Sequence, residues 1–184
     1  MTVVARTAER VLLDTSVIIN FAQAGALLEL ARYLGERGAI VLDVAEELRR
    51  NTDRFPQLAN LAEIGWPHGE PLALPPDLLA DAEALQRLHS REGAHEAENR
   101  GEIATALLAA RLRAIAVIDD ALGKRLCRMR GVARLSTAQL AAEMVAAGAL
   151  EDERGFRVFD LATPSPAGRD EYREAVEKAK HALS

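Results

Sequence analysis

The sequence is poor in cysteine and in aromatic residues, and it has no long hydrophobic run. Its single cysteine, Cys127, excludes an internal disulfide and a zinc site built from several cysteines. Aromatic residues make up only 4% of the 184 residues, so the core must be assembled from Ala, Leu, Val and Ile. No apolar run approaches the roughly 20 residues that span a bilayer. Arg6, Glu9 and Arg10 interrupt any signal-peptide hydrophobic segment. We therefore expect a cytoplasmic protein with no membrane association.

The residues that are abundant indicate a globular chain. Hydrophobic residues make up 49% and charged residues of both signs 28%, which is typical of a folded domain. The length suits one ordinary domain with a short additional element. The net charge of -5 argues against nucleic-acid binding over the whole surface. It allows a nucleic-acid enzyme that carries acids at its centre and basic residues at its rim.

Short apolar segments alternate with helical patterns along the chain. Such alternation predicts an α/β fold with three α/β/α layers around a central parallel sheet. A segment with four of the seven prolines, 65–76, is expected to be a loop, and 91–100 is a polar connection. Strands are expected at 10–13, 39–42, 114–118 and 132–135. Helices are expected at 17–34 with a break near Gly25, from 44 onward, and at 77–90, 101–113, 121–130 and 137–147.

The end of the chain differs from the rest. We expect one domain over residues 1–150 and an extension over 151–184, with a linker at 161–168 and a charged helix at 169–183. The apolar residues of that helix form a narrow stripe that is too thin to be stable alone in water. The stripe must therefore dock on its own domain, on a second subunit or on another protein. It consists of Tyr172, Val176, Ala179 and Leu183.

Carboxylates follow two of the expected strands. Asp14 comes directly after 11–13, and Asp119 and Asp120 come directly after 116–118. Ligands of an open parallel sheet bind outside the carboxyl ends of its strands, where these acids would meet. The simpler interpretation is helix capping, since an acid at a helix N-terminus is stabilising by about 0.3–1 kcal/mol. The arrival of acids from two strands at one sheet edge favours a functional site.

A further acid is expected one turn into the helix after the second strand. This acid is Glu47, and Glu46 directly before it leaves the position ambiguous by one residue. Their alternative role is a solvated helix face on which they pair with Arg49 and Arg50 at helical spacing.

Glu102 begins the most apolar helix, among small residues at Gly101 and 104–106. Several carboxylates in one pocket would repel one another, and a divalent cation relieves that repulsion. Mg²⁺ or Mn²⁺ prefers such oxygen ligands and supports phosphodiester hydrolysis. The histidines have no zinc-ligand spacing and are interpreted as surface or structural residues: His68, His89, His95 and His181.

Four short motifs that contain these acids follow one another within residues 10–147. They are Val11-Leu12-Leu13-Asp14-Thr15-Ser16-Val17-Ile18-Ile19-Asn20, Glu47-Leu48, Gly101-Glu102, and Asp119-Asp120 followed by Lys124-Arg125-Leu126. In this order and spacing, the sequence resembles the PIN-domain family, particularly its prokaryotic VapC-type toxin branch. Each motif alone is weak, and the four in order are specific.

The resemblance implies a PIN-like, metal-dependent endoribonuclease that uses Mg²⁺ or Mn²⁺, is commonly a homodimer and is usually silenced by a cognate antitoxin. The implied catalytic residues are Asp14, Glu47, Glu102, Asp119 and Asp120, of which Asp14, Glu102, Asp119 and Asp120 would bind metal. Two adjacent pairs leave the ligand ambiguous by one residue: Glu46 with Glu47, and Asp119 with Asp120. The extension after residue 150 departs from the family pattern, and the sequence does not specify which RNA is cut.

Two further sets of residues are candidates for supporting roles. Thr15 and Ser16 can orient the Asp14 carboxylate through hydrogen bonds, or Ser16 can cap the first helix. Basic residues of the helix after Asp120 could hold substrate phosphates, or they could form a solvated basic face. These basic residues are Lys124, Arg125 and Arg128.

Three other classes of protein are weaker interpretations. A haloacid-dehalogenase-type phosphotransferase needs a second Asp two positions after the first, where this chain has Ser16. A receiver domain needs its acid pair after strand one, whereas here the pair comes late. A non-catalytic PIN-like module, for nucleic-acid binding or assembly, remains the serious alternative, although the retained acids argue against it.

Overall fold

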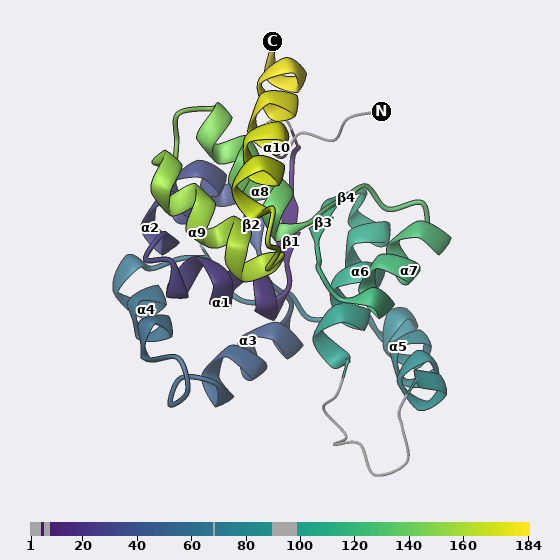
Figure 1. Ribbon diagram of the computed structural model, residues 1–184. Helices are drawn as coiled ribbons and strands as arrows, with labels where there is room; N and C mark the ends of the chain where they lie inside the picture. Colours follow the sequence, from purple (N-terminus) through teal and green to yellow (C-terminus); the bar gives the residue numbers. More distant parts are fainter. Residues whose placement is uncertain (1–4, 6–7, 68, 90–98) are drawn as a thin grey trace.

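The computed structural model describes residues 5, 8–67, 69–89 and 99–184 (Figure 1). Four strands form one sheet in the order β2-β1-β3-β4, and every neighbouring pair is parallel. The expected α/β fold with a central parallel sheet is therefore confirmed. The strands are β1 (Val11–Leu13), β2 (Gly38–Ala39), β3 (Ile115–Val117) and β4 (Arg134–Leu135).

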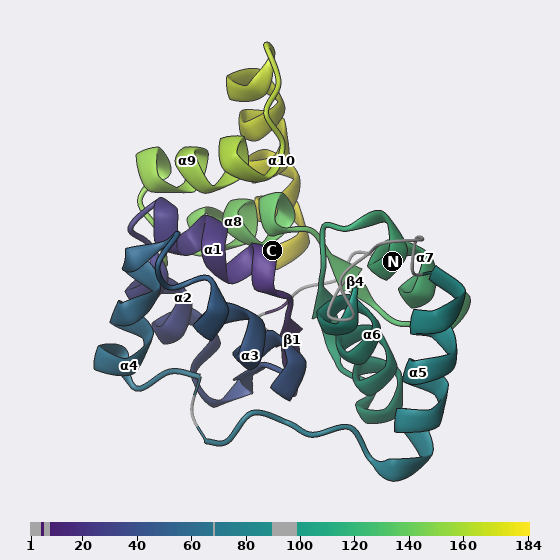
Figure 2. The same cartoon turned by 90° about the horizontal axis from the view of Figure 1, so that it is seen from below.

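Helices cover both faces of this sheet. Figures 1 and 2 show α6 and α7 on one side of the sheet and α1 and α8 on the other. The α-helices are α1 (Thr15–Gln23), α2 (Leu27–Leu34), α3 (Leu42–Arg50), α4 (Asn60–Ile64), α5 (Pro76–His89), α6 (Arg100–Leu112), α7 (Ala121–Met129), α8 (Thr137–Ala146), α9 (Asp152–Ala162) and α10 (Gly168–Leu183). Short 3-10 helices occur at Gly35–Arg37 and Pro56–Ala59.

The core lies between the central strands and α6. All residues of β1 and β3 are buried, and so are those from Ile103 to Ala109 in α6. Small residues such as Ala104 and Ala106 let α6 approach both strands closely. This close packing fixes the start of α6 at the carboxyl edge of the sheet.

The second strand is shorter than the sequence pattern predicts. The apolar run 39–42 favours a strand, but β2 ends at Ala39 and α3 begins at Leu42. Between them, Val41 forms an isolated parallel bridge with Leu72. The partner comes from the proline-bearing segment that the sequence marks as a loop, so local patterning could not reveal the pairing. The expected polar connection 91–100 lies mostly outside the described residues.

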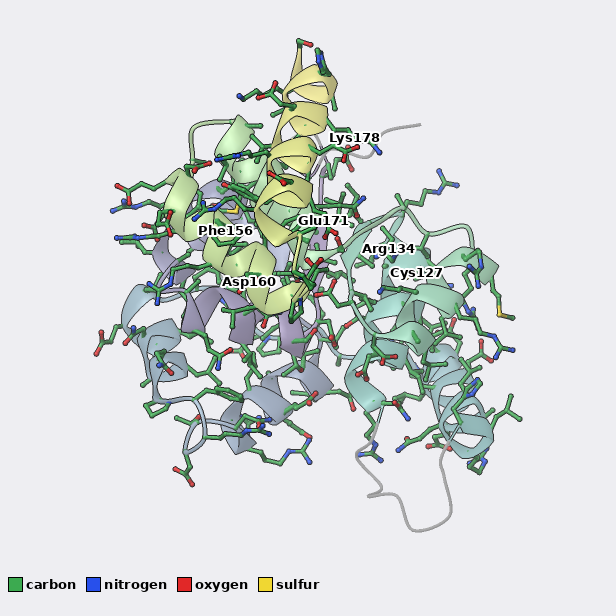
Figure 3. The ribbon with its side chains drawn as sticks, in the orientation of Figure 1. Cys127, Arg134, Phe156, Asp160, Glu171 and Lys178 are labelled. Carbon is green, nitrogen blue, oxygen red and sulfur yellow. The ribbon has the colours of Figure 1, made fainter. Side chains whose placement is uncertain are left out.

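The end of the chain forms two helices that pack against α8. The sequence predicts α10 but not α9, and both contact α8. Tyr172 of α10 is only 1% exposed and sits edge-on to the rings of Phe156 and Phe159, each 5.5 Å away between centroids. Its hydroxyl lies 2.9 Å from both the backbone carbonyl and a carboxylate oxygen of Asp152. Figure 3 shows Phe156 on α9 beside α10. The first half of the stripe therefore docks on its own chain.

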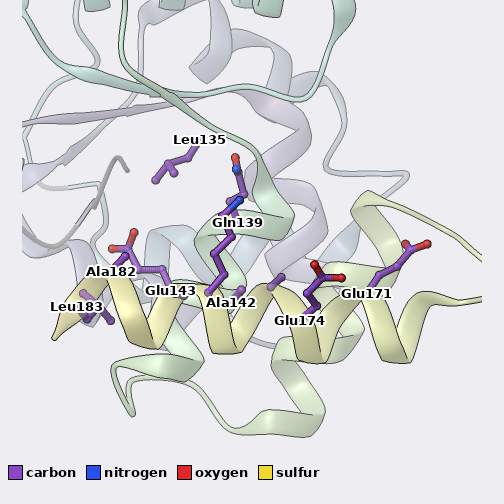
Figure 4. A pocket seen from close by; sticks show the side chains of 11 residues that line it. Leu135, Gln139, Ala142, Glu143, Glu171, Glu174, Ala182 and Leu183 are labelled. Carbon is purple, nitrogen blue, oxygen red and sulfur yellow. The ribbon is translucent and has the colours of Figure 1, made fainter. Parts of the chain in front are cut away.

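The second half of the stripe is less covered. Ala179 and Leu183 line a groove of about 280 Å³ between α10 and α8, beside Leu135 (Figure 4). Glu143 and Glu174 also line this groove, and the acids singled out in the sequence do not. The groove is thus a feature of the extension that is separate from those acids.

Gly155 lets α9 approach α8 and α10. A methyl group added at Gly155 would lie 2.3 Å from a methyl carbon of Val145 and 2.8 Å from the hydroxyl of Tyr172. We expect Gly155→Ala to lower the free energy of unfolding by about 1–3 kcal/mol, because the crowded side chains must move. Urea unfolding followed by circular dichroism measures this change. Arg157→Ala, an exposed change on α9, is the matched control. Equal stability of the two variants would contradict the close packing of the extension.

Candidate functional site

Asp14 lies at the end of β1, where α1 begins, and its side chain is buried. The residue is 2% exposed. The Ser16 hydroxyl donates to Asp14 Oδ2 over 2.9 Å. Asp14 Oδ1 has no hydrogen-bond partner within the described part of the chain. The amides of Thr15 and Ser16 lie close enough to lower the Asp14 pKa, but neither meets the geometry of a helix cap. Capping therefore does not account for this carboxylate.

Burial controls the electrostatics of Asp14. Loss of water raises the pKa of Asp14 to about 6, and the nearby charge of Glu47 adds to the rise. The hydrogen bond from Ser16 opposes it. A buried carboxylate with an unpartnered oxygen is costly when charged, so a cation at this position would stabilise it.

Glu47, rather than Glu46, faces Asp14. The Thr15 hydroxyl donates to Glu47 Oε2 over 2.7 Å, whereas Glu46 is exposed. The sequence offered both hydroxyls as donors that orient the Asp14 carboxylate. In the structure Ser16 donates to Asp14, whereas Thr15 donates to Glu47.

Gly101 brings the start of α6 against these two carboxylates. A Cβ atom at Gly101 would lie 3.3 Å from Glu47 Oε2 and 3.5 Å from Asp14 Oδ1. It would also lie 3.2 Å from a methyl carbon of Val44. A larger residue would therefore fill the space that both carboxylates border.

Glu102 is half-buried and lies within the electrostatic reach of three other acids. Burial first, and then the charges of Asp14, Glu47 and Asp120, raise the pKa of Glu102 to about 7. Gly123 allows α7 to approach, since a Cβ atom there would lie 3.5 Å from Glu102 Cβ. Glu102 of α6 thus lies within electrostatic reach of Glu47 of α3 and of Asp14 and Asp120, which directly precede α1 and α7.

The adjacent pair Asp119 and Asp120 separates into two roles. Asp119 Oδ1 accepts a hydrogen bond of 3.0 Å from the amide of Thr137, the first residue of α8. Asp120 caps α7 by accepting a 2.6 Å bond from the amide of Leu122. Each carboxylate thus accepts a hydrogen bond from an amide at the start of a helix, as the helix-capping interpretation expected. The charge of Asp120 is one of the leading causes that raise the pKa of Glu102, and the charge of Asp119 is not.

These carboxylates do not form a closed metal cage. Among the described residues, no three His, Cys, Asp or Glu side chains converge in a way that could hold a metal ion. The chemistry of the donors nevertheless suits a hard cation, because all four are carboxylates. The unpartnered oxygen of Asp14 and the raised pKa values of Asp14 and Glu102 indicate a carboxylate site whose leading charge interactions, within the described residues, come from other acids.

The expected basic residues are exposed on α7: Lys124, Arg125 and Arg128.

The structure also points to two residues that the sequence did not indicate. Asp43 lies one turn before Glu47 on α3, and burial raises its pKa. Arg100 partly opposes this rise, and its Nε donates to Gln86 Oε1 of α5 over 3.2 Å. The spacing of four residues from Glu47 could have indicated Asp43, and the position next to Gly101 could have indicated Arg100.

Comparison with family models, with curated proteins and with solved structures finds no match for this chain. Within the described ranges, no helix is both long and apolar enough to cross a membrane. Of the histidines, His68 and His95 lie outside the described residues. Cys127 is buried in α7 and free of a disulfide.

Proposed function

We propose that the chain is a PIN-like endoribonuclease that depends on Mg²⁺ or Mn²⁺ to hydrolyse RNA phosphodiester bonds. The observation that carries the proposal is the buried, unpartnered oxygen of Asp14, which borders the same small space at Gly101 as the Glu47 carboxylate. Helix capping or surface solvation does not require such an arrangement. The order of the four sequence motifs supports the same conclusion.

The residues that would hold the cation are Asp14, Glu102 and Asp120, with Glu47 beside them. A bound cation supplies activation of water and stabilisation of the charge on the phosphoryl oxygens. The protein's own residues prepare the site. The Ser16 hydroxyl bonds Asp14 Oδ2 and leaves Oδ1 beside the space at Gly101, whereas the Thr15 hydroxyl bonds Glu47 Oε2, the oxygen that itself borders this space. Asp119 remains a further candidate ligand, because its Oδ1 bonds the Thr137 amide but its buried Oδ2 has no hydrogen-bond partner within the described residues.

Glu102 has a raised pKa of about 7 in the metal-free protein, so both of its protonation states are populated near neutral pH before a cation binds. Cation binding would lower this pKa, so its final value depends on the loaded site.

The toxin assignment, the cognate antitoxin and the homodimer rest on the family resemblance alone. Within the proposal, the antitoxin would inhibit the nuclease, and the homodimer would be its assembly. The cytoplasm is the compartment that fits an RNA substrate and a chain with a single cysteine.

Thermal unfolding with and without Mn²⁺, paired with an RNA cleavage assay, tests the proposal. We expect Mn²⁺ to raise the melting temperature, because a ligand that binds only the folded state stabilises it by about 2.7 kcal/mol at one hundred times its dissociation constant. Cleavage of a mixed RNA pool should require Mn²⁺ or Mg²⁺ and stop with a chelator. A protein that neither responds to Mn²⁺ nor cuts RNA would instead be the non-catalytic module.

A further inference from the structure

We infer that Arg100 binds a phosphate of the RNA strand next to the carboxylate site. The inference rests on the proposed function, and it adds a substrate-positioning residue that the sequence motifs do not contain. Arg100 is exposed at the first position of α6, directly before Gly101 and Glu102. It thus lies beside the acids but extends from the protein surface.

Neighbouring helices hold this side chain at the edge of the site. Its Nε donates to Gln86 of α5, and its charge acts on the half-buried Asp43 of α3. Arg100 and Asp43 both line a groove of about 170 Å³ that also includes Gln86 and Ile103. Asp43 lies one turn before Glu47 on α3, so the groove meets this helix on the side that carries Glu47, although Glu47 itself does not line it.

The charge around Arg100 explains why a cation is needed there. Four carboxylates of the site would repel an approaching phosphodiester. A guanidinium presents several N–H donors that match a phosphate, and the bond to Gln86 uses only Nε. Exposed cations precede Glu102 in α6 and follow Asp120 in α7 along the chain: Arg100 in the first case and the basic residues of α7 in the second.

The hydrogen bond to Gln86 is a structural contact of Arg100, but it does not neutralise the charge of the guanidinium. Arg100 is exposed, and no ion pair within 4 Å joins it to Asp43 among the described residues. Other arginines at the surface of α5 and α6 do make such pairs: Arg111 lies 3.4 Å from Asp77. Arg111 is on the same helix and provides a matched control, because its side chain is also exposed.

Binding of a mixed-sequence single-stranded RNA tests the inference without relying on cleavage. The measurement is fluorescence anisotropy across a series of KCl concentrations, with Asp14→Asn in every protein to prevent turnover. Loss of one phosphate contact to a single strand should reduce the slope of log affinity against log salt by about 0.7. We expect this reduction for Arg100→Gln, no reduction for Arg111→Gln, and a retained slope for Arg100→Lys.

The outcomes separate this inference from the proposed function. Equal slopes for Arg100→Gln and Arg111→Gln would overturn the phosphate contact, and wild-type RNA cleavage would still stand as the test of the nuclease. Failure of the parent protein to bind RNA would also overturn the contact. If Arg100→Gln reduced the salt slope only by partial unfolding, its melting temperature would also be lower. In that case Arg100→Lys is the deciding variant, and a salt slope reduced in Arg100→Lys as well would reject the phosphate contact.

Discussion

Asp14→Asn is expected to abolish Mn²⁺-dependent RNA cleavage, lowering the rate by at least about 10³-fold. The substitution removes a charge from the centre of the proposed cation site at nearly constant volume, and each 1.4 kcal/mol lost from the transition state costs about tenfold in rate. Its amide oxygen can still accept the bond from Ser16. Because the native carboxylate is buried with one unpartnered oxygen, the metal-free variant should be at least as stable as the wild type at neutral pH.

Glu46→Gln provides the matched control for this prediction. It removes a carboxylate of the same helix that carries Glu47, but Glu46 is exposed. We expect its cleavage rate to stay within about twofold of wild type, in line with the small effects of surface changes. A purified Asp14→Asn protein that cuts RNA as fast as Glu46→Gln would remove Asp14 from the site and end the nuclease assignment.

The metal-free protein is expected to lose stability as the pH rises from about 4 to about 7. The pKa of Asp14 is raised from 3.8 to about 6 and that of Glu102 from 4.5 to about 7. In this window the folded state holds protons that the unfolded state has released, so the free energy of unfolding falls with pH. A tenfold change in proton affinity is worth about 1.4 kcal/mol, so we expect a loss on the order of 2–3 kcal/mol from Asp14.

Urea unfolding at several pH values, with and without Mn²⁺, measures this dependence. Mn²⁺ should restore more stability at pH 8 than at pH 5, since metal binding requires deprotonated carboxylates. Asp14→Asn should flatten the metal-free profile, and Glu102→Gln should flatten its upper part. A wild-type protein whose metal-free stability rises steadily from pH 4 to pH 7 would contradict the buried, charge-coupled site.

The sequence predicts the order of strands and helices well because most elements are marked locally. Gly25, at a positive φ of 68°, separates α1 from α2 as expected, and α6 to α8 lie within a residue or two of their expected ranges. The errors have a non-local origin. The pairing of Val41 with Leu72 depends on a distant segment, and α9 depends on packing against α8. Periodicity within a window contains neither contact.

For the site, the sequence predicts which acids approach the sheet edge but not how each is held. It favours Glu47 through the Glu47-Leu48 motif but keeps Glu46 as an alternative, and the hydrogen bond from Thr15 to Glu47 distinguishes the two in the structure. Asp119 and Asp120 likewise look interchangeable until the amides of Thr137 and Leu122 bind them. The sequence also gives no prediction for Arg100, because its neighbours Asp43 and Gln86 come from other helices.

The short outer strands of the sheet bear on how the protein behaves in concentrated solution. Both edges, β2 and β4, are only two residues long, so they offer few unpaired amides and carbonyls to another chain. At β4, the guanidinium of Arg134 turns inward to bond the carbonyl of Ile118 and adds charge to this edge. Long, flat, uncharged edges are the surfaces that promote aggregation through added strands. This sheet therefore resists strand-mediated aggregation, and precipitation on heating should require loss of the helices that cover it.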